Sequence, residues 1–254
     1  GHSDTEILVE YISHFGLSVA LKDIVGMFAF ALWDSSSKKL SLVRDRIGEK
    51  PLYYRISDGA VLFGSEISCI EQGAQSELFV DRQALSQLVR QGYICAPLSI
   101  YDGVFKVKPG ECVTFDVILN QKVERFWCLN DVARESKSEF VSDDELLGEL
   151  EDLLSDSVKG QMLSDVPIGG FLSGGVDSSL ISALMQKYSA QPIKTFSIGF
   201  DDPMYDEANF SRKVANHLGT EHHELYISAK DVLTAVTEIQ NMFSEPFGDS
   251  SQLP

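Results

Sequence analysis

The stretch SGGVDSS (173–179) brings together residue types that can bind a phosphate group. It lies between the apolar run VPIGGFL (166–172) and an apolar helix, where a strand ends and a helix begins. Its glycines let main-chain amides approach a ligand closely, the helix start supplies unpaired N–H groups, and its serines add hydroxyl donors. Such a loop suits phosphate or pyrophosphate. Asp177 would repel that anion without a cation between them, so its presence indicates Mg²⁺.

This loop differs from two other phosphate-binding patterns. It lacks the lysine of GxxxxGK[ST], and it does not have the spacing of GxGxxG. Composition alone leaves a second interpretation open, in which SGGVDSS is a glycine-rich turn whose aspartate and serines only cap the following helix.

Strand and helix patterns alternate around the loop. The expected strands are 166–172, 193–200 and 221–227. The expected helices run from the loop to about Tyr188 and from about Tyr205 to Leu218, where Gly219 ends the second one. Strands separated by helices predict a parallel sheet with right-handed crossovers.

An earlier helix is predicted to begin at Ser142, because Glu145 completes a capping-box pattern with it. Its apolar stripe consists of Leu146, Leu150, Leu153, Leu154 and Val158. The preceding residues 129–141 (LNDVARESKSEFV) are polar with little periodicity and form the best linker in the chain. We therefore expect a first domain at 1–128, a linker at 129–141 and a second domain at 142–254.

The first part of the chain has a different pattern. Within residues 5–21, apolar residues at helical spacing predict a helix, and Gly16 is expected to end it. Four β-rich runs separated by turn signals then predict an antiparallel meander with at least one buried face. These runs are 24–34, 38–45, 50–56 and 60–66. A short helix is expected at 81–92 and further strands within 104–118.

Composition excludes several classes of function. The chain has 254 residues, 44% of them hydrophobic, as in a soluble globular protein, and no apolar run approaches the ~18 residues of a membrane helix. The four cysteines are scattered, which argues against a zinc site or disulfide scaffold and favours a cytoplasmic, reducing compartment. A net charge of −17 argues against nucleic acid as the main partner. A nucleotide remains compatible, because main-chain N–H groups and one magnesium ion can form a phosphate site.

Longer motifs extend the evidence of the loop. SDVPIGGFLSGGVDSSLISALM (164–185), TFSIGF (195–200), VANHLGTEHHE (214–224) and EPFGDSSQLP (245–254) resemble the glutamine-dependent asparagine synthetases. GMFAFALWD (26–34), RDRIGEKPLYY (44–54) and FGSEI (63–67) resemble the second half of that family's glutaminase domain. The resemblance runs through nearly the whole chain in the expected order.

This resemblance implies a fold that combines α/β and α+β architecture. An antiparallel β-sandwich of the Ntn type is expected for the glutaminase portion. A parallel-sheet domain of the PP-loop ATP pyrophosphatases, which are adenine nucleotide alpha-hydrolase-like, is expected to follow it.

The resemblance also implies roles for residues. Asp177 is implied as the ligand of Mg²⁺, and Asp4 as the residue that holds the α-amino group of glutamine. The implied ATP-binding residues are Leu172, Ser173, Gly174, Gly175, Val176, Asp177, Ser178 and Ile198. Leu172 and Ile198 can also be ordinary buried strand residues, and the two interpretations are compatible because strand ends border the ligand crevice in such sheets.

Other polar residues have two interpretations each. Glu245, Asp249 and Ser250 can contact substrate or metal, or they can be exposed loop residues. Asp4 can also be the N-cap of the first helix.

Two further polar groups are not expected to do chemistry. Arg44, Asp45 and Arg46 are interpreted as a charged turn that holds the register of the sheet. His217, His222 and His223 have no metal-ligating partners at useful spacing and are interpreted as surface or strand-edge residues.

In the family that the chain resembles, an N-terminal cysteine hydrolyses glutamine and the ammonia passes to the second domain. There ATP and Mg²⁺ adenylate a carboxylate, and ammonia then gives an amide, AMP and pyrophosphate; with aspartate the product is asparagine. This chain begins at Gly1 and contains no SGxGxDE motif. We therefore expect a fragment without the nucleophile and the second acidic loop, inactive by itself.

Two alternatives for the function stay open. Residues 26–34 and 44–54 also resemble paralogues associated with bacterial surface polysaccharides, so the acceptor can be aspartate, a sugar acid or another carboxylate. The other alternative is a non-catalytic ATP-binding protein on the same fold. The expected partners are glutamine, ATP and the acceptor, with no nucleic acid and no membrane, and a homodimer is left open.

Overall fold

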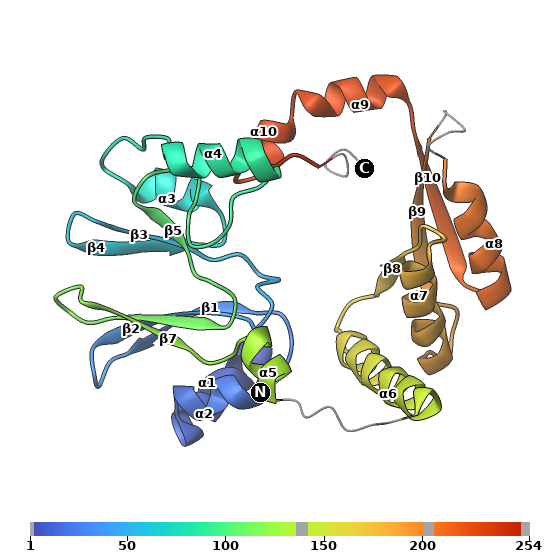
Figure 1. The fold of residues 1–254 in the computed structure, drawn as a ribbon, viewed down its shortest axis with the longest axis horizontal. Coiled ribbons are helices and arrows are strands. Elements are labelled where there is room, and N and C mark those ends of the chain that lie inside the picture. The colour runs from blue at the N-terminus through green and yellow to red at the C-terminus, as the bar shows by residue number, and fades with distance from the viewer. Residues whose placement is uncertain (1–2, 136–141, 201–205, 250–254) are drawn as a thin grey trace. The chain divides into compact units, whose positions relative to one another are not determined.

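The computed structural model describes residues 3–135, 142–200 and 206–249 (Figure 1). These residues form two compact units, and each unit is described by itself. The first contains the described residues up to Glu135 together with Gln240–Asp249, and the second contains those from 142 to 239. Residues 240–249 thus follow the second unit in sequence but pack in the first, whereas the sequence assigns them to the second domain.

Two antiparallel sheets form the centre of the first unit (Figure 1). One sheet has the strand order β1-β2-β6-β7, and the other has the order β4-β3-β5. The strands of the first sheet are β1 (Ala29–Asp34), β2 (Lys39–Arg44), β6 (Glu111–Phe115) and β7 (Gln121–Arg125). Those of the second sheet are β3 (Tyr53–Ser57), β4 (Ala60–Gly64) and β5 (Val104–Lys106).

The prediction of a single meander is wrong, although each of the four runs contains a strand. The first two runs pair with each other and the next two pair with each other, but β2 and β3 belong to different sheets. The connection between them explains the difference. The Asp45 carboxylate accepts hydrogen bonds from the N–H groups of residues 47–50, and this tight turn passes the chain from one sheet to the other.

Helices of the first unit begin and end at local signals. They are α1 (Asp4–Phe15), α2 (Leu17–Asp23), α3 (Ile67–Gly73), α4 (Arg82–Gln91) and α5 (Leu129–Glu135). Gly16 ends α1, as predicted, with a φ of 82°. Asp81 caps α4 by accepting hydrogen bonds from the N–H groups of Gln83 and Ala84 at 2.6 and 3.2 Å. The sequence pattern does not reveal α3, and α5 lies within the expected linker.

Alternate strand residues of the first unit pack in different layers. Leu42 of β2 and Tyr54 of β3 are buried in one cluster that joins the two sheets. Their neighbours Val43 and Tyr53 lie in two other clusters, which contain residues of α2 and α3 respectively. The first unit therefore has the layer order helix, sheet, sheet, helix (Figure 1).

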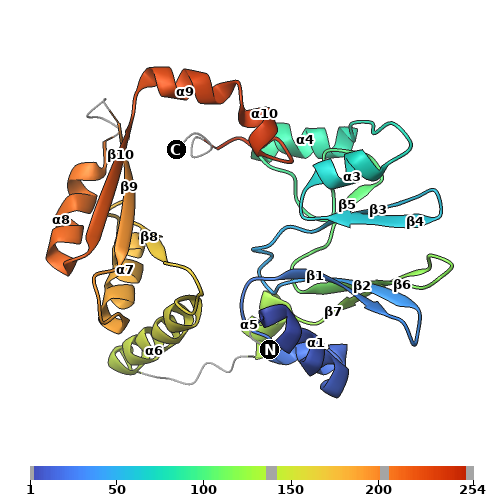
Figure 2. The same cartoon turned by 180° about the vertical axis from the view of Figure 1, so that it is seen from behind.

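The second unit contains a parallel sheet with the strand order β10-β9-β8, as predicted (Figure 2). Its strands are β8 (Gly169–Phe171), β9 (Lys194–Phe200) and β10 (Glu221–Ile227). The helices α7 (Val176–Tyr188) and α8 (Ala208–Leu218) connect these strands in turn, and Gly219 ends α8 in the left-handed conformation. The other helices are α6 (Asp143–Gln161), α9 (Ala229–Val236) and α10 (Ile239–Met242), the last at the boundary between the units.

Helix α6 begins as predicted, but only part of its predicted apolar stripe is buried. The Glu145 N–H donates to the Ser142 hydroxyl at 3.4 Å, and the Ser142 N–H donates to the Glu145 carboxylate at 3.0 Å, which completes the capping box. Leu154 and Val158 pack in the core with residues of α7. Leu146, Leu150 and Leu153 are 49%, 52% and 70% exposed, because only the C-terminal part of α6 packs against that core.

No helix in the described ranges combines the length and the apolar character that a membrane span requires. The four cysteines are free thiols. Burial raises the pKa of the Cys112 thiol, which lies in the core of the first unit.

Candidate functional site

The SGGVDSS loop lies at the carboxyl end of β8, at the edge where open α/β sheets bind ligands. Leu172 is 1% exposed, and its N–H donates to the Phe196 carbonyl of β9 at 2.8 Å. The chain therefore leaves the sheet at Ser173, and α7 begins at Val176 with Gly175 as its N-cap. The predicted order of strand, loop and helix is confirmed.

The serines of the loop hold it in shape. The Ser173 and Ser178 hydroxyls lie 3.0 Å apart, and the Ser173 N–H donates to the Ser178 hydroxyl at 3.2 Å. The Ser178 hydroxyl also donates to the Gly175 carbonyl at 3.3 Å. The Ser179 hydroxyl is closed off from solvent and has no hydrogen-bond partner among the described residues. Before any ligand enters, the hydroxyls of Ser173 and Ser178 thus bind the loop to itself.

Gly174 is required by the packing of the loop as well as by its backbone conformation. Its φ is +82°, which residues with a side chain rarely adopt. A Cβ at this position would lie 2.7 Å from the Phe210 Cβ and 2.8 Å from the Ser211 nitrogen, both in α8. Gly175 has a φ of −71°, and a Cβ there would meet only the Ser173 hydroxyl at 3.4 Å. The loop is therefore fixed against α8 at Gly174 and open at Gly175.

The first turn of α7 presents donors and an acid to solvent. The Ser179 N–H donates to the Gly175 carbonyl, so the N–H groups of residues 176–178 precede the first helical hydrogen bond and have no acceptor within the helix. Asp177 is exposed in this turn, and Val176 is 83% exposed. Ile198 of β9 is half-buried and lies two residues after Phe196, toward the carboxyl end of the strand. The arrangement places N–H groups, one carboxylate and apolar surface at one edge of the sheet.

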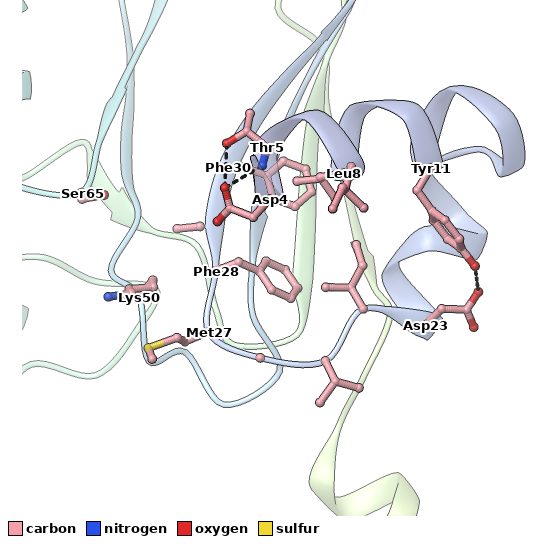
Figure 3. A pocket seen from close by; sticks show the side chains of 15 residues that line it. Asp4, Thr5, Leu8, Tyr11, Asp23, Met27, Phe28, Phe30, Lys50 and Ser65 are labelled. Carbon is pink, nitrogen blue, oxygen red and sulfur yellow. Dashed lines mark hydrogen bonds between the residues drawn. The ribbon is translucent and has the colours of Figure 1, made fainter. Parts of the chain in front are cut away.

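A pocket of about 750 Å³ lies in the first unit beside the start of α1 (Figure 3). Asp4, Lys50 and Ser65 supply polar groups, and the remaining lining is mostly apolar. Asp4 is exposed, and its Oδ1 accepts hydrogen bonds from the Thr5 N–H at 2.7 Å and the Thr5 hydroxyl at 3.3 Å (Figure 3). Ser3 rather than Asp4 occupies the N-cap position of α1, so the N-cap interpretation of Asp4 is wrong by one residue.

Arg44 and Asp45 have the structural role predicted for them. Asp45 is 1% exposed, and Arg44 donates hydrogen bonds to the carbonyls of Gly48, Lys50 and Val107 at 2.7–2.9 Å. Burial alone would raise the pKa of the Asp45 carboxyl. Hydrogen bonds from the main-chain N–H groups that surround it outweigh burial and hold that pKa below its ordinary value. This pair therefore stabilises a turn.

Glu245 is not an exposed loop acid. Its side chain is 11% exposed and forms an ion pair with Lys106, which is 12% exposed. One carboxylate oxygen accepts the Ile100 N–H at 2.7 Å, and the other lies 3.4 Å from the Tyr53 hydroxyl. Burial, and then the charge of Glu245, raise the pKa of Tyr53. The interpretation of Glu245 as an exposed loop acid is therefore wrong, and its contact with a ligand stays a prediction, since it lines a pocket while its oxygens are bonded within the first unit.

Two candidates near the C-terminal end of the sequence remain. Asp249 is exposed, and Ser250 lies outside the described residues. Within residues 3–135, 142–200 and 206–249, no three His, Cys, Asp or Glu side chains lie close enough together to hold a metal ion. A metal at the loop would thus rely on Asp177, phosphate oxygens and water, a set that suits Mg²⁺.

Buried polar side chains beneath α8 correct the interpretation of one histidine. His217 and His223 are exposed, as predicted. The His222 side chain is 9% exposed, and its two ring nitrogens lie 2.9 Å from the Thr195 hydroxyl and 3.1 Å from the Ser197 hydroxyl. Residues 195 and 197 are polar at alternate positions of one predicted strand, and residue 222 is polar in the next. This pattern could have indicated a shared buried face.

Family models match both parts of the chain. Residues 1–127 match the glutamine amidotransferase domain, and residues 149–254 match asparagine synthase. The chain is 31% identical over 256 residues to putative asparagine synthetase (glutamine-hydrolyzing) 2 of Methanocaldococcus jannaschii, covering 99% of this chain and 48% of the relative. It is 32% identical over 252 residues to asparagine synthetase (glutamine-hydrolyzing) 1 of Bacillus subtilis, covering 99% and 39%.

A third relative has a different name. The chain is 29% identical over 238 residues to an amidase of Gibberella zeae, covering 88% of this chain and 34% of the relative. The chain thus spans less than half the length of each of these three curated relatives.

Proposed function

The chain belongs to the family of glutamine-hydrolysing asparagine synthetases, and we propose that its SGGVDSS loop binds the phosphates of ATP for the amidation of a carboxylate. In the proposed reaction glutamine supplies the nitrogen and ATP is cleaved to AMP and pyrophosphate. The layers of the first unit support an Ntn-type sandwich, and the parallel sheet of the second supports a PP-loop fold. The division into domains 1–128 and 142–254 is part of the same proposal, with residues 240–249 of the second domain packing in the first unit.

The proposal rests on the geometry at the start of α7. Residues 176–178 direct N–H groups without helical acceptors toward the edge of the sheet, and the helix adds partial positive charge there. Gly175 leaves its main chain uncovered, and Gly174 holds the loop against α8. A phosphate chain finds preorganised donors in this arrangement.

Each residue of the loop has a part in the proposed binding. Main-chain N–H groups of residues 176–178 donate to phosphate oxygens, and the Ser173 and Ser178 hydroxyls exchange their mutual hydrogen bond for bonds to the ligand. Asp177 holds Mg²⁺, which neutralises the phosphate charge when bound. Ile198 supplies apolar surface for the base and sugar and Val176 extends that surface, whereas the Leu172 side chain is buried and offers them none.

Adenylation explains why a carboxylate acceptor needs ATP. A bare carboxylate is a poor electrophile, and AMP provides the leaving group that ammonia displaces. We place the binding of glutamine in the pocket beside α1, where Asp4 is a negatively charged partner for the α-amino group. Lys50 and Ser65 add polar groups to the same pocket.

Aspartate is the proposed acceptor, which gives asparagine. A second candidate is a different carboxylate such as a sugar acid, because residues 26–34 and 44–54 also resemble paralogues associated with bacterial surface polysaccharides. An assay of AMP formation by the full-length protein, with glutamine and either aspartate or a panel of uronic acids, separates the two candidates. Formation of AMP with aspartate alone supports the first candidate, and formation with a uronic acid alone replaces it.

Calorimetry with ATP tests the nucleotide site. The protein should take up ATP in the presence of Mg²⁺ and lose this uptake in EDTA. In the full-length protein, Asp177→Ala should abolish magnesium-dependent uptake and pyrophosphate release while leaving glutamine hydrolysis measurable. Asp165→Ala is the matched control, because Asp165 is an exposed acid outside the loop. If ATP uptake persists in Asp177→Ala as in Asp165→Ala, the assignment of Asp177 is wrong.

A further inference from the structure

Beneath α8, one face of the parallel sheet is polar where a core is normally apolar. Thr195 and His222 are partners in the register of β9 and β10, and Ser197 is the next residue of β9 on the same face. Thr195 is fully buried, Ser197 is 8% exposed and the His222 side chain is 9% exposed. Buried polar groups of this kind are costly unless they are hydrogen-bonded.

Hydroxyl groups satisfy both nitrogens of the imidazole. Nδ1 of His222 lies 2.9 Å from the Thr195 hydroxyl, and Nε2 lies 3.1 Å from the Ser197 hydroxyl. A neutral imidazole has one donor and one acceptor nitrogen, and hydroxyls can play either role. Thr195 continues the chain to the Thr220 hydroxyl at 2.8 Å. His222 therefore bridges two hydroxyls of β9 from its place in β10.

The network continues into the first turn of α8. The Ser211 hydroxyl is fully buried and lies 3.1 Å from the Ser197 hydroxyl and 2.9 Å from the Ala208 carbonyl. Ser211 has one proton for these two oxygens, so Ser197 either accepts from Ser211 and donates to Nε2 of His222, or donates to Ser211 and accepts from Nε2. One face of α8 is thus fastened to the sheet through Ser197 and His222.

The same turn of α8 is the surface on which the loop rests. A Cβ at Gly174 would lie 2.8 Å from the Ser211 nitrogen and 2.7 Å from the Phe210 Cβ, so the loop backbone is in close contact with both residues. A shift of α8 away from or toward the sheet must therefore move Gly174. The order of contacts is His222, Ser197, Ser211 and Gly174.

A second attachment limits how far α8 can move. The guanidinium of Arg212 donates to both carboxylate oxygens of Glu224 in β10, at 2.7 and 2.5 Å. Arg212 also donates to the Tyr226 hydroxyl at 3.0 Å. Loss of the His222 bond therefore leaves α8 attached at one side, and the expected result is a displaced loop in a folded unit.

We propose that His222 is a positioning residue for the nucleotide loop, acting through Ser197 and Ser211 on Gly174. His222 does not touch the ligand; it sets the place of the α8 turn that supports the loop. This inference rests on the proposed function, because its effect is measured as affinity for ATP.

A matched pair of substitutions tests the route. In His222→Gln the side-chain amide reaches as far as Nε2 and can keep the bond to Ser197, whereas in His222→Asn the shorter amide can replace only Nδ1 and keeps the bond to Thr195. We expect His222→Asn to weaken magnesium-dependent ATP binding about tenfold and His222→Gln to change it less than about threefold. His223→Gln, at the exposed neighbour, should leave the affinity unchanged.

A second control tests whether His222→Asn weakens ATP binding only because it destabilises the second unit. Ile193→Val removes a methylene from the core of the same unit, at a residue 7% exposed and away from the α8 turn. If Ile193→Val lowers the melting temperature as much as His222→Asn does, it should still bind ATP like the wild type. Circular dichroism checks that each variant is folded.

Four results would overturn the inference. Equal ATP affinities of His222→Asn and His222→Gln would exclude the route through Ser197. If Ile193→Val weakened ATP binding as much as His222→Asn, the effect of His222→Asn would be explained by lost stability alone. If the wild-type protein itself takes up no ATP with Mg²⁺, the proposed function fails and the inference fails with it, whereas ATP binding by the wild type with no effect of His222→Asn overturns the inference alone.

Discussion

The Glu245 carboxylate is ion-paired with the Lys106 ammonium, and nearly nine-tenths of each side chain is buried. This pair attaches residues from the end of the chain to β5 of the first unit. Two main-chain groups strengthen the attachment: the Gly248 N–H donates to the Gly92 carbonyl at 2.6 Å, and the Ile67 N–H donates to the Ser244 hydroxyl at 3.3 Å. The first unit is therefore completed by residues that follow the second unit in sequence.

Lys106→Met should destabilise the first unit by about 3 kcal/mol, because it leaves the Glu245 carboxylate buried without its partner. The double variant Lys106→Met/Glu245→Leu should recover more than half of this loss, since it removes both charges. Both tryptophans, Trp33 and Trp127, lie in the first unit, so their fluorescence during urea unfolding reports on that unit.

An exposed ion pair provides the control for this measurement. Lys122 pairs with Glu124 at 2.7 Å with side chains 71% and 59% exposed, so Lys122→Met should cost less than about 1 kcal/mol. A loss from Lys106→Met no larger than that from Lys122→Met would show that the buried pair does not hold the segment in place.

Gly174→Ala should cost the second unit about 2 kcal/mol or more, because alanine must adopt a φ of +82° and its Cβ must displace the backbone of α8. Gly175→Ala should cost less than about 1 kcal/mol, since its φ of −71° suits any residue and its nearest neighbour is a hydroxyl at 3.4 Å. Hydrogen exchange of peptides from β8 and α8, read by mass spectrometry, measures both changes. Similar costs for the two variants would contradict the packing described for Gly174.

Asp45→Asn should lower the free energy of unfolding of the first unit by about 2–3 kcal/mol, because an amide offers one acceptor oxygen and presents N–H groups to main-chain donors. Asp34→Asn is the matched change in another turn, where the carboxylate accepts the Ser36 N–H at 2.9 Å but is exposed. Its effect should be smaller. Tryptophan fluorescence in urea compares the two variants, and a larger effect at Asp34 would refute the role assigned to Asp45.

Features that depend on a few neighbouring residues could be predicted from the sequence. The Ser142 capping box, the ends of helices at Gly16 and Gly219, and the loop between β8 and α7 all follow from local chemistry. The parallel order of the second sheet also follows, because a helix between two strands favours it.

Features that depend on distant residues could not be predicted in this way. Nothing near Glu245 in the sequence indicates Lys106, and the pairing of β2 with β6 rather than β3 depends on the turn that Asp45 holds. Val43 and Leu42 look alike in the sequence but belong to different cores. His222 was misplaced for a related reason: a polar residue on a strand suggests a surface until its buried hydroxyl partners are known.

His222 should also make the stability of the second unit depend on pH. Burial lowers the pKa of its imidazole below the ordinary value of 6.5; the charges of Arg212 and His223 act in the same direction, against the opposing effect of Glu224. Below about pH 6.5 His222 therefore binds a proton more readily in the unfolded chain than in the folded chain. The contribution of His222 to stability thus falls as the pH decreases below that value and is constant above it.

His222→Gln lacks this proton and keeps the bond to Ser197. From about pH 8 to about pH 5.5, protection of β9 and β10 from hydrogen exchange should decrease more in the wild type than in His222→Gln, because only the wild type has the buried imidazole. An equal decrease in the two proteins would mean that His222 carries its proton as readily in the folded chain as in the unfolded one.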